Sequence, residues 1–314
     1  MTIFSKIGLG ILLLLVTTIS LICLLFGYTD KSVDDLKTNY APPPSAFVSI
    51  MDMEVHYRNE GHPNDSLPIV LIHGTGASLH TFNEWTVELA KDRRVIRMDL
   101  PGFGLTGPFP DGDYSMAHYI EFINQFLIQQ KVNRCVLGGN SLGGQIAWNF
   151  TLHHPEKVDK LILIDAAGYP LESKEVPIAF RLARIPILNK ILTFITPRST
   201  VRASIESVYA DHSKVTEELV DRYLELTLRE GNRQGLVDRM NTKLIDNKVD
   251  QIKHIKAPTL ILWGEEDLLI PTKSAYRFQT DLTNDTLVIM PNVGHVPMEE
   301  SPMESLAIVK AFLE

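Results

Sequence analysis

Cysteines are scarce in this sequence, and patterns typical of metal sites are missing. Of the 314 residues, two are cysteines. Cys23 lies in an apolar run and Cys135 begins a strand-like one, so we expect no disulfide between them. No pair of cysteines or histidines has the spacing of a zinc site, and no HExxH motif occurs. The sequence therefore predicts no metal site.

Positive charge is also in short supply. Lysine and arginine number 30 against 38 acidic residues, which gives a net charge of −8. Such a surface repels phosphate backbones, so we expect no nucleic-acid partner. The GxGxxG match at 102–107 follows Pro101 and leads into a loop-like stretch instead of a helix, and a Walker A lysine is absent. We therefore expect no nucleotide or other organic cofactor.

A long uncharged run stands near the N-terminus, from Ile7 to Tyr28. As a helix it would span roughly 33 Å, enough to cross a hydrocarbon core of about 30 Å. No cleavage site of a signal peptide follows, so residues 1–29 are predicted to be an uncleaved transmembrane anchor. Lys6 precedes the run and mostly acidic residues follow it. The positive-inside rule then places the main domain on the non-cytoplasmic side of the membrane. Residues 30–46, which include three consecutive prolines, are expected to form an extended linker.

From residue 47 onward, short apolar runs alternate with helical patterns. Strands that are buried on both faces have this composition, since a parallel sheet covered by helices has no polar face. The alternation predicts an α/β fold with a mostly parallel, twisted sheet flanked by helices. Two early strands are expected within residues 47–58. The runs are IVLIHG, RVIRMDL, CVLGGN, KLILIDA, TLILWG and TLVIMP, and the helices are expected near 82–90, 115–130, 142–154, 273–281 and 302–313.

One interval is too long for a simple crossover and predicts a helical cap inserted at 168–245. Within it, residues 178–197 are apolar, carry Arg181, Arg184 and Lys190, and contain no acidic residue. Two interpretations remain open for this stretch. It contacts anionic lipid and passes acyl chains to the site, or its apolar face packs over the main domain.

A serine surrounded by glycines ends the run CVLGGN and begins a helical pattern. Gly139, Ser141 and Gly143 fit the G-x-S-x-G motif. In a strand–turn–helix setting this motif is a nucleophile elbow, whose tight turn projects the hydroxyl above the sheet. The alternative is a plain flexible turn. We predict that Ser141 is a catalytic nucleophile.

A serine hydroxyl needs a base, which in turn needs an orienting carboxylate. His295 follows the last predicted strand and Asp267 follows the one before it, which matches the chain order Ser, acid, His expected for this type of elbow. Both lie at carboxyl ends of strands, where open α/β sheets place their sites. Glu265 and Glu266 adjoin Asp267, and Asp165 ends an earlier strand, so these are alternative acids. We interpret Asp165 as a carboxylate that structures its loop.

Two backbone N–H groups are expected to stabilise an oxyanion. The first belongs to Thr75, in the small-residue stretch HGTGAS after the first parallel strand, and the second belongs to Leu142, just after the nucleophile. We expect His73 to brace this loop and not to transfer protons.

These motifs resemble the α/β-hydrolase superfamily over residues 47–314. The matching pieces are HGTGAS, DLPGFGLT, GGNSLGGQIAW, LILIDAAG, WGEEDLLIP and VGHVPMEESP. Within that superfamily the chain looks like the capped, membrane-associated monoacylglycerol lipases and related esterases. The resemblance implies the triad Ser141, Asp267 and His295, and the oxyanion donors Thr75 and Leu142.

The predicted function is hydrolysis of carboxylic esters, monoacylglycerol-like or other acyl lipids, without a metal or cofactor. The expected partners are an acyl-ester lipid or small ester substrate and a membrane, which is bound through the N-terminal helix and through the cap if the lipid interpretation holds. Two alternatives stay open. One is hydrolysis of a carbon–carbon bond in a vinylogous diketone, because such hydrolases share this elbow. The other is a non-catalytic binding module on a hydrolase-like scaffold.

Overall fold

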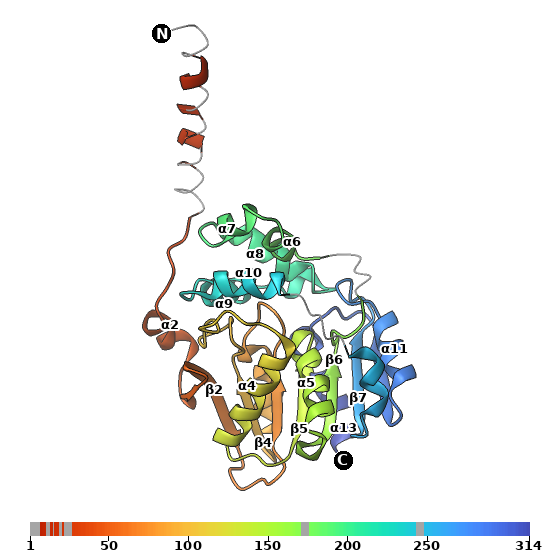
Figure 1. Cartoon of the computed structure of the whole chain (residues 1–314). Coiled ribbons are helices and arrows are strands. Elements are labelled where there is room, and N and C mark those ends of the chain that lie inside the picture. Colours follow the sequence, from red (N-terminus) through yellow and green to blue (C-terminus); the bar gives the residue numbers. More distant parts are fainter. Residues whose placement is uncertain are drawn as a thin grey trace.

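The computed structural model describes residues 7–10, 13–14, 16–18, 21, 27–170, 176–242 and 248–314. Its centre is a sheet of eight strands in the order β1-β2-β4-β3-β5-β6-β7-β8 (Figure 1). All neighbours from β4 to β8 along this order run parallel, and β2 pairs antiparallel with both β1 and β4. The strands are β1 (Ser45–Ile50), β2 (Met53–Gly61), β3 (Ile69–Ile72), β4 (Arg94–Met98), β5 (Cys135–Asn140), β6 (Val158–Ile164), β7 (Thr259–Gly264) and β8 (Asp285–Met290).

Helices cover both faces of this sheet. One face carries α4 (Met116–Gln129), α5 (Leu142–His153) and α11 (Lys273–Asp281), and the other carries α3 (Asn83–Leu89) and α13 (Pro302–Leu313). The short helix α12 (Pro297–Glu300) precedes α13. Every residue of β3, β5 and β7 is buried, as expected for strands between two helical layers. The predicted α/β class with a mostly parallel sheet is therefore confirmed.

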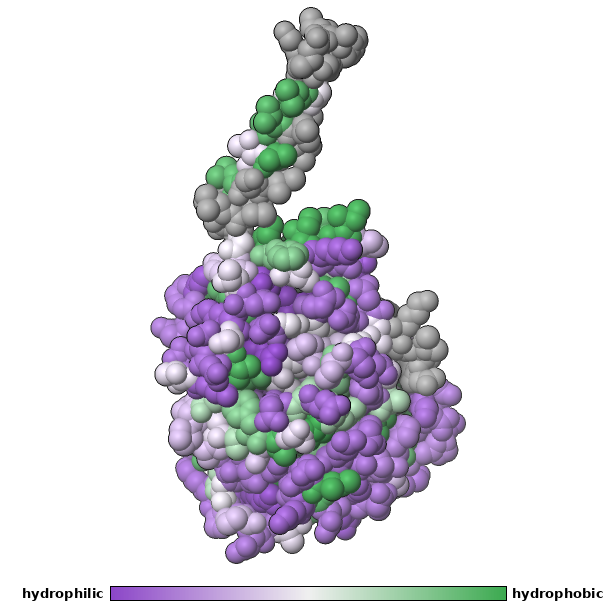
Figure 2. All heavy atoms as spheres, turned by 60° about the vertical axis from the view of Figure 1, so that its left-hand side comes forward, coloured by the Kyte–Doolittle hydropathy of each residue, from purple (hydrophilic) through white to green (hydrophobic). Residues whose placement is uncertain are grey.

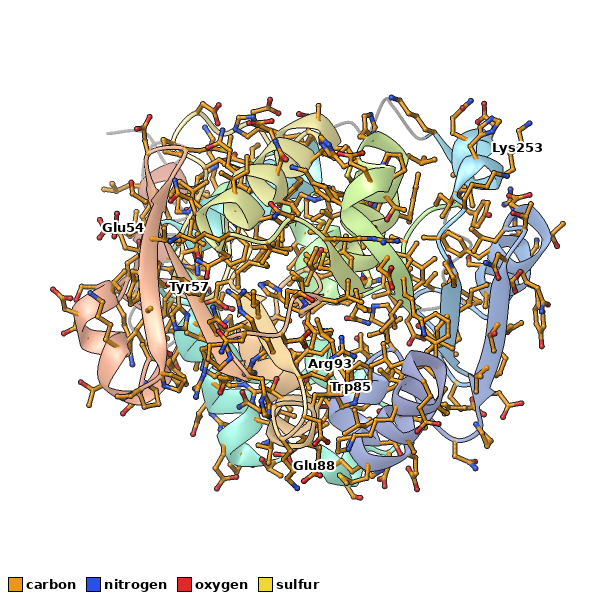
Figure 3. The ribbon with its side chains drawn as sticks, turned by 90° about the horizontal axis from the view of Figure 1, so that it is seen from below. Glu54, Tyr57, Trp85, Glu88, Arg93 and Lys253 are labelled. Atoms are coloured by element: carbon orange, nitrogen blue, oxygen red, sulfur yellow. The ribbon has the colours of Figure 1, made fainter. Side chains whose placement is uncertain are left out.

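The two helices of one layer are joined by a buried indole. Trp85 of α3 lies against α13 (Figure 3), and its Nε1–H donates to Ser305 Oγ at 3.0 Å and to the main-chain oxygen of Pro302 at 3.1 Å. A buried indole N–H needs such an acceptor, since leaving it unpaired would cost about 1–3 kcal/mol. This contact fixes α13, the helix that follows the His295 loop in the chain.

In the described residues between β6 and β7 there are five α-helices, which we call the cap. They are α6 (Ile178–Ala183), α7 (Leu188–Leu192), α8 (Arg198–Glu206), α9 (Glu217–Thr227) and α10 (Asn232–Asn241). Figure 1 shows the cap above one end of the sheet, over the ends of its strands. The expected insertion at 168–245 contains all five, while residues 171–175 and 243–247 of that range lie outside the described residues. Ile187 and Phe194 of the cap are 75% and 68% exposed, and Figure 2 shows an apolar patch on the outer surface of the cap. The main-chain oxygen of Phe194 accepts the N–H of Tyr28 at 3.2 Å.

The predicted transmembrane anchor at 1–29, and the membrane location inferred from it, are contradicted. Within the described parts of the chain, no helix has the length and apolar character needed to cross a membrane. Crossing a hydrocarbon core takes about 20 continuous, mostly apolar helical residues. Residues 1–6, 11–12, 15, 19–20 and 22–26 of the predicted anchor lie outside the described residues.

The expected extended linker at 30–46 is instead partly helical and packed. Helix α2 spans Val33–Tyr40 and begins with a capping box, in which Ser32 and Asp35 bond each other's backbone N–H groups. Leu36 of this helix is buried against Leu226 of the cap. The proline run that suggested a spacer follows the helix, so the helix and the prolines occupy different parts of this segment.

Candidate active site

Ser141 stands at the junction of β5 and α5 in a sharply bent backbone. Its φ is 55° and its ψ is −115°, a conformation that is costly for a residue with a side chain. Hydrogen bonds to the end of β6 and to the loop after it hold the bend: the Ser141 N–H donates to Ile164 O, and the Ala167 N–H donates to Ser141 O, both at 3.0 Å. The turn leaves Ser141 partly exposed, whereas its neighbours on either side are buried.

The glycines around the serine are required by close approach of backbone to backbone. A Cβ at Gly139 would lie 2.2 Å from the main-chain oxygen of Gly143. A Cβ at Gly143 would lie 2.2 Å from the main-chain oxygen of Ile72. Strand, turn and helix can meet this closely only without these side chains, which is the geometry that a nucleophile elbow needs.

His295 is bonded to Asp267 across two loops. The loop after β8 carries His295 and the loop after β7 carries Asp267, and Nδ1 of the imidazole lies 2.6 Å from Oδ2 of the carboxylate. The other oxygen, Asp267 Oδ1, accepts the N–H groups of Leu269 and Ile270 at 2.9 Å each. With three donors around it, Asp267 is held as an anion and accepts from Nδ1–H. Nε2 of His295 is then left with its lone pair, as a base requires.

The main chain of His295 is held from two sides. Its carbonyl oxygen accepts the side-chain Nδ2–H of Asn140 at 3.0 Å, and its N–H donates to Val208 O at 2.8 Å. Asn140 directly precedes Ser141, and Val208 belongs to the segment that connects α8 and α9 of the cap. The position of the imidazole therefore depends on the elbow and on the cap together.

Two acidic side chains strengthen the link between the cap and the His295 loop. Glu300 accepts the N–H of Gly294 through Oε2 and the N–H of Asp211 through Oε1, both at 2.7 Å. Glu299 forms an ion pair with Arg222 of α9 and accepts the hydroxyl of Tyr223 at 2.8 Å. Because these contacts cross from α12 to the cap, the cap is fixed at the side where it meets His295.

The loop after β3 lies beside the serine. A Cβ at Gly74 would lie 3.1 Å from Ser141 Cβ, and the neighbouring Thr75 lines the same cavity as Ser141. Leu142 is the first residue of α5, and the first N–H groups of a helix have no partner within it. His73 is buried, with Nδ1 2.8 Å from Gly74 O and Nε2 accepting the Leu100 N–H at 2.9 Å. Burial lowers the pKa of His73, which suits a neutral brace for the loop.

A cavity of about 300 Å³ opens above these groups. Thr75, Ser141 and His295 line its base. Its walls come mostly from the cap and are apolar, with Phe180, Leu182, Leu188, Ile191, Val201 and Ile205 among them. Leu188 and Ile191 also belong to the exposed apolar surface of α7. The site is thus an apolar space with a few polar groups at one end, the usual form of a small-molecule site.

Asp165 is the third ionisable group at this site, and the cluster does not suit a metal ion. One ligand atom each from Asp165, Asp267 and His295 lies within 4.8 Å of the others. However, both oxygens of Asp267 already accept protein hydrogen bonds, and Nδ1 of His295 is one of the donors. A cation would have to break these bonds to obtain its ligands, so we assign the cluster to proton and hydrogen-bond chemistry.

The structure brings the five predicted site residues to one end of the sheet. Asp267 and His295 are hydrogen-bonded, Thr75, Ser141 and His295 share the cavity, and Leu142 follows the serine at the start of α5. Sequence reasoning missed Asn140, Glu300 and Val208, which hold the His295 loop. Asn140 lies in the motif GGNSLGGQIAW and Glu300 lies in the motif VGHVPMEESP. Their closeness in sequence to Ser141 and His295 was the one indication that they support the site. Val208 acts through its backbone, and its side chain gives no such indication.

Comparison with known proteins identifies a matching family and several similar proteins. A family model described as the alpha/beta hydrolase fold matches residues 68–302. The 2-hydroxy-6-oxo-6-(2'-aminophenyl)hexa-2,4-dienoic acid hydrolase of Metapseudomonas resinovorans is 27% identical over 276 residues, which cover 85% of this chain and 90% of the relative. The monoacylglycerol lipase abhd6-A of Xenopus laevis is 24% identical over 273 residues, which cover 85% of this chain and 81% of the relative.

A solved structure matches almost end to end. The crystal structure of a membrane phospholipase A, described as a bacterial virulence factor, superposes with a TM-score of 0.69 and 26% identity. The match covers 98% of this chain and 98% of that one. The similar proteins thus include a monoacylglycerol lipase, a phospholipase A and a hydrolase of a dienoic acid.

Proposed function

The chain belongs to the α/β-hydrolase family, and on that premise we propose that it hydrolyses carboxylic esters, of the monoacylglycerol type or other acyl lipids. The observation that carries this proposal is the 2.6 Å bond between His295 and Asp267 at the base of an apolar cavity that Ser141 also lines. An acyl chain fits the apolar walls, and its ester carbonyl fits the polar end.

The proposed reaction has two halves. Ser141 Oγ attacks the ester carbonyl carbon while Nε2 of His295 takes the hydroxyl proton, and the N–H groups of Thr75 and Leu142 stabilise the oxyanion. The intermediate collapses, and His295 returns the proton to the departing alcohol. Water then attacks the acyl-enzyme with His295 again as the base, which releases the carboxylic acid and restores the serine. Asp267 keeps Nδ1–H oriented and stabilises the imidazolium in both halves.

A second candidate is hydrolysis of a carbon–carbon bond, which the relative from Metapseudomonas resinovorans supports. The substrate named for that relative is a carboxylic acid, and a buried carboxylate needs a cation. Among the described residues that line the cavity, Arg233 is the one arginine or lysine. Its guanidinium is already paired with Asp30, with Nη2 to Oδ1 at 2.5 Å and Nε to Oδ1 at 3.1 Å. This pairing offsets the charge that an anionic dienoate would need, which favours an uncharged ester, and it leaves the buried Nη1 of Arg233 without an acceptor among the described residues.

The test is a rate profile on p-nitrophenyl esters of increasing acyl length, on a monoacylglycerol and on a ring-cleavage dienoate. We expect ester hydrolysis to dominate, and Ser141→Ala to lose about six powers of ten in kcat, as in other triad hydrolases. Ser204→Ala is the matched control, because Ser204 lines the same cavity and its hydroxyl only donates to Thr200 O at 2.8 Å. Faster turnover of the dienoate would support the second candidate.

A fluorophosphonate probe separates both enzymes from a binding module. A catalytic serine becomes covalently labelled, so we expect labelling of the wild type and of Ser204→Ala but not of Ser141→Ala. A wild-type protein that neither reacts with the probe nor hydrolyses any of the esters would contradict the proposed function.

A further inference from the structure

Asp165 lies behind the pair of Asp267 and His295, and the proposed reaction assigns it no role. It directly follows β6, and Asp267 lies in the loop after the neighbouring strand β7. An oxygen of each carboxyl group and a ring nitrogen of His295 lie within 4.8 Å of one another. Asp165 is fully buried, and Asp267 is 2% exposed.

The backbone and one carboxyl oxygen of Asp165 are fixed against β7. Its N–H donates to Leu262 O at 3.0 Å, and its Oδ1 accepts the Gly264 N–H at 2.9 Å. The φ of Asp165 is 43°, a left-handed conformation that aspartate tolerates better than most residues. Its second oxygen, Oδ2, is buried without a donor from the described part of the chain. A carboxylate would leave this oxygen charged and unsatisfied, whereas a carboxylic acid could donate from it.

The surrounding charges decide which of the two acids is ionised. Burial raises the pKa of Asp165 well above its ordinary value, and the neighbouring charge and hydrogen bond of Asp267 and the charge of Glu300 raise it further. Among the described residues, three donors bond the two oxygens of Asp267, whereas one bonds Asp165. Two adjacent buried carboxylates cannot both be charged at little cost, so the negative charge rests on Asp267.

We propose that Asp165 is a positioning residue of the triad: it is a neutral acid whose O–H donates a hydrogen bond to the Asp267 carboxylate. Asp267 is then held by the loop N–H groups, by His295 and by Asp165, and it cannot turn away from the imidazole. Asp165 keeps its proton throughout the reaction and touches no reacting atom. This inference rests on the proposed function, because it assigns Asp165 a role in orienting the proposed catalytic acid.

Asparagine is the substitution that tests this role, because its amide can replace both interactions of the neutral acid. In Asp165→Asn, Oδ1 still accepts the Gly264 N–H and Nδ2 can donate to Asp267. We expect kcat/KM to stay within roughly threefold of the wild type. Asp165→Ala removes the donor, and we expect kcat to fall by roughly tenfold or more because the catalytic acid is no longer fixed.

The pH profile of kcat/KM separates a neutral Asp165 from a charged one. The ionisable groups that face Asp165 are Asp267, His295 and Glu300. If Asp165 is neutral, asparagine changes no charge near His295, and the acid limb of the profile stays in place. If Asp165 is ionised, the substitution removes a nearby negative charge, and the acid limb moves to lower pH by roughly one unit. A shift of that size, or full activity of Asp165→Ala, would overturn the proposal.

Infrared spectroscopy on the intact protein gives a readout that does not depend on activity. We expect the carbonyl band of a protonated carboxylic acid at pH 7, sensitive to exchange into D2O and missing in Asp165→Asn. Asp159→Asn is the matched control, since Asp159 lies on β6, the strand that Asp165 follows, and pairs with Arg134; it should keep the band and the kinetics. If Asp165→Ala does not fold, Asp165→Asn still tests whether Asp165 is neutral, through the infrared carbonyl band and through the acid limb of the pH profile of kcat/KM.

Different experimental results would refute this inference and the proposed function. Ester hydrolysis that survives in Ser141→Ala would refute the proposed function, and the infrared band would still report the state of Asp165. If Ser141→Ala is inactive and the Asp165 band is absent from the wild type, the triad stands and the neutral Asp165 is refuted.

Discussion

The side-chain amide of Asn140 donates to the main-chain oxygen of His295 at 3.0 Å. It connects the residue before the proposed nucleophile to the proposed base, across 155 positions of the sequence. The same Nδ2 also donates to Ile164 O at 3.2 Å, so one amide joins the ends of β5 and β6 to the His295 loop. The turn that carries Ser141 and the loop that carries His295 are therefore held together by a residue that takes no part in the proposed chemistry.

Asn140→Ala should lower kcat by roughly 10- to 100-fold, because small displacements of a catalytic base are costly. We expect a smaller change in KM and a loss of about 1 kcal/mol in the free energy of unfolding. Steady-state kinetics and urea unfolding measure both. Asn149→Ala is the control: Asn149 is equally buried, but its Nδ2 donates to Gln145 O within α5 at 2.9 Å. The interpretation fails if the two variants lose activity to the same degree.

Val201→Phe should shorten the preferred acyl chain. Val201 is a half-buried residue of α8 on the wall of the cavity, and a larger side chain there reduces the space for the substrate. Because each methylene in such a pocket is worth about 1–3 kcal/mol, we expect the ratio of decanoyl to butyryl ester hydrolysis to fall by roughly tenfold or more. Val87→Phe, at a position on α3 that is 62% exposed, should leave this ratio unchanged. An unchanged ratio in Val201→Phe would mean that the acyl chain binds elsewhere.

Gly143→Ala should destabilise the fold strongly, because the new Cβ would lie 2.2 Å from the main-chain oxygen of Ile72. Relief requires a shift of backbone at the end of β3, and we expect a loss of about 3 kcal/mol in the free energy of unfolding. Gly112→Ala separates this clash from backbone strain: Gly112 has a φ of 69° but no atom within 4 Å of an added Cβ, so about 1 kcal/mol is expected. Equal losses in urea unfolding would contradict the close-approach argument.

Stability should fall with pH below neutrality, in part through His80. Its Nε2–H donates to Tyr40 O at 2.9 Å and its Nδ1 lies 3.0 Å from Ser78 Oγ, and burial lowers the pKa of His80 from 6.5 to about 3. Between these two pKa values the unfolded chain binds one proton more than the folded chain at this histidine, so the free energy of unfolding increases with pH in this window. The stabilising contribution of a neutral His80 is lost as pH falls through the window. The contribution is fully present above pH 6.5.

We expect His80→Gln to show a shallower dependence of unfolding free energy on pH between 6.5 and 3 than the wild type. The control is His62→Gln, since His62 is exposed while its Nε2 also pairs with a main-chain oxygen, that of Lys91. Urea unfolding at several pH values measures the slopes. An identical slope in the wild type and in His80→Gln would show that His80 does not carry this linkage.

Much of the fold could be predicted because its strands are short, apolar and buried on both faces. The helices expected near 115–130 and 302–313 are observed as α4 (Met116–Gln129) and α13 (Pro302–Leu313). The helix within segment 30–46 was missed. The prolines of this segment dominated the interpretation, although Ser32 and Asp35 have the spacing of a capping box.

The site was partly accessible from the sequence for a related reason. The spacing of Gly139, Ser141 and Gly143 follows from backbone contact within one turn, so a local motif records it. The bonds from His295 to Asn140 and Val208 depend on how distant segments meet, and a main-chain acceptor leaves no mark in the sequence. The relation of Asp165 to Asp267 likewise requires the pairing of β6 with β7, which periodicity does not specify.

The contacts of residues 27–40 also limit how this protein can be shortened. Lys31 and Tyr40 both bind Glu225 of α9, at 2.5 and 2.7 Å, and Asp30 pairs with Arg233 of α10. A truncated chain that begins at residue 47 would leave the carboxylate of Glu225 and the buried guanidinium of Arg233 in the cap without these partners. Such a shortened protein would hold the cap helices around the cavity less firmly, and engineering work on this protein should retain the segment from residue 27.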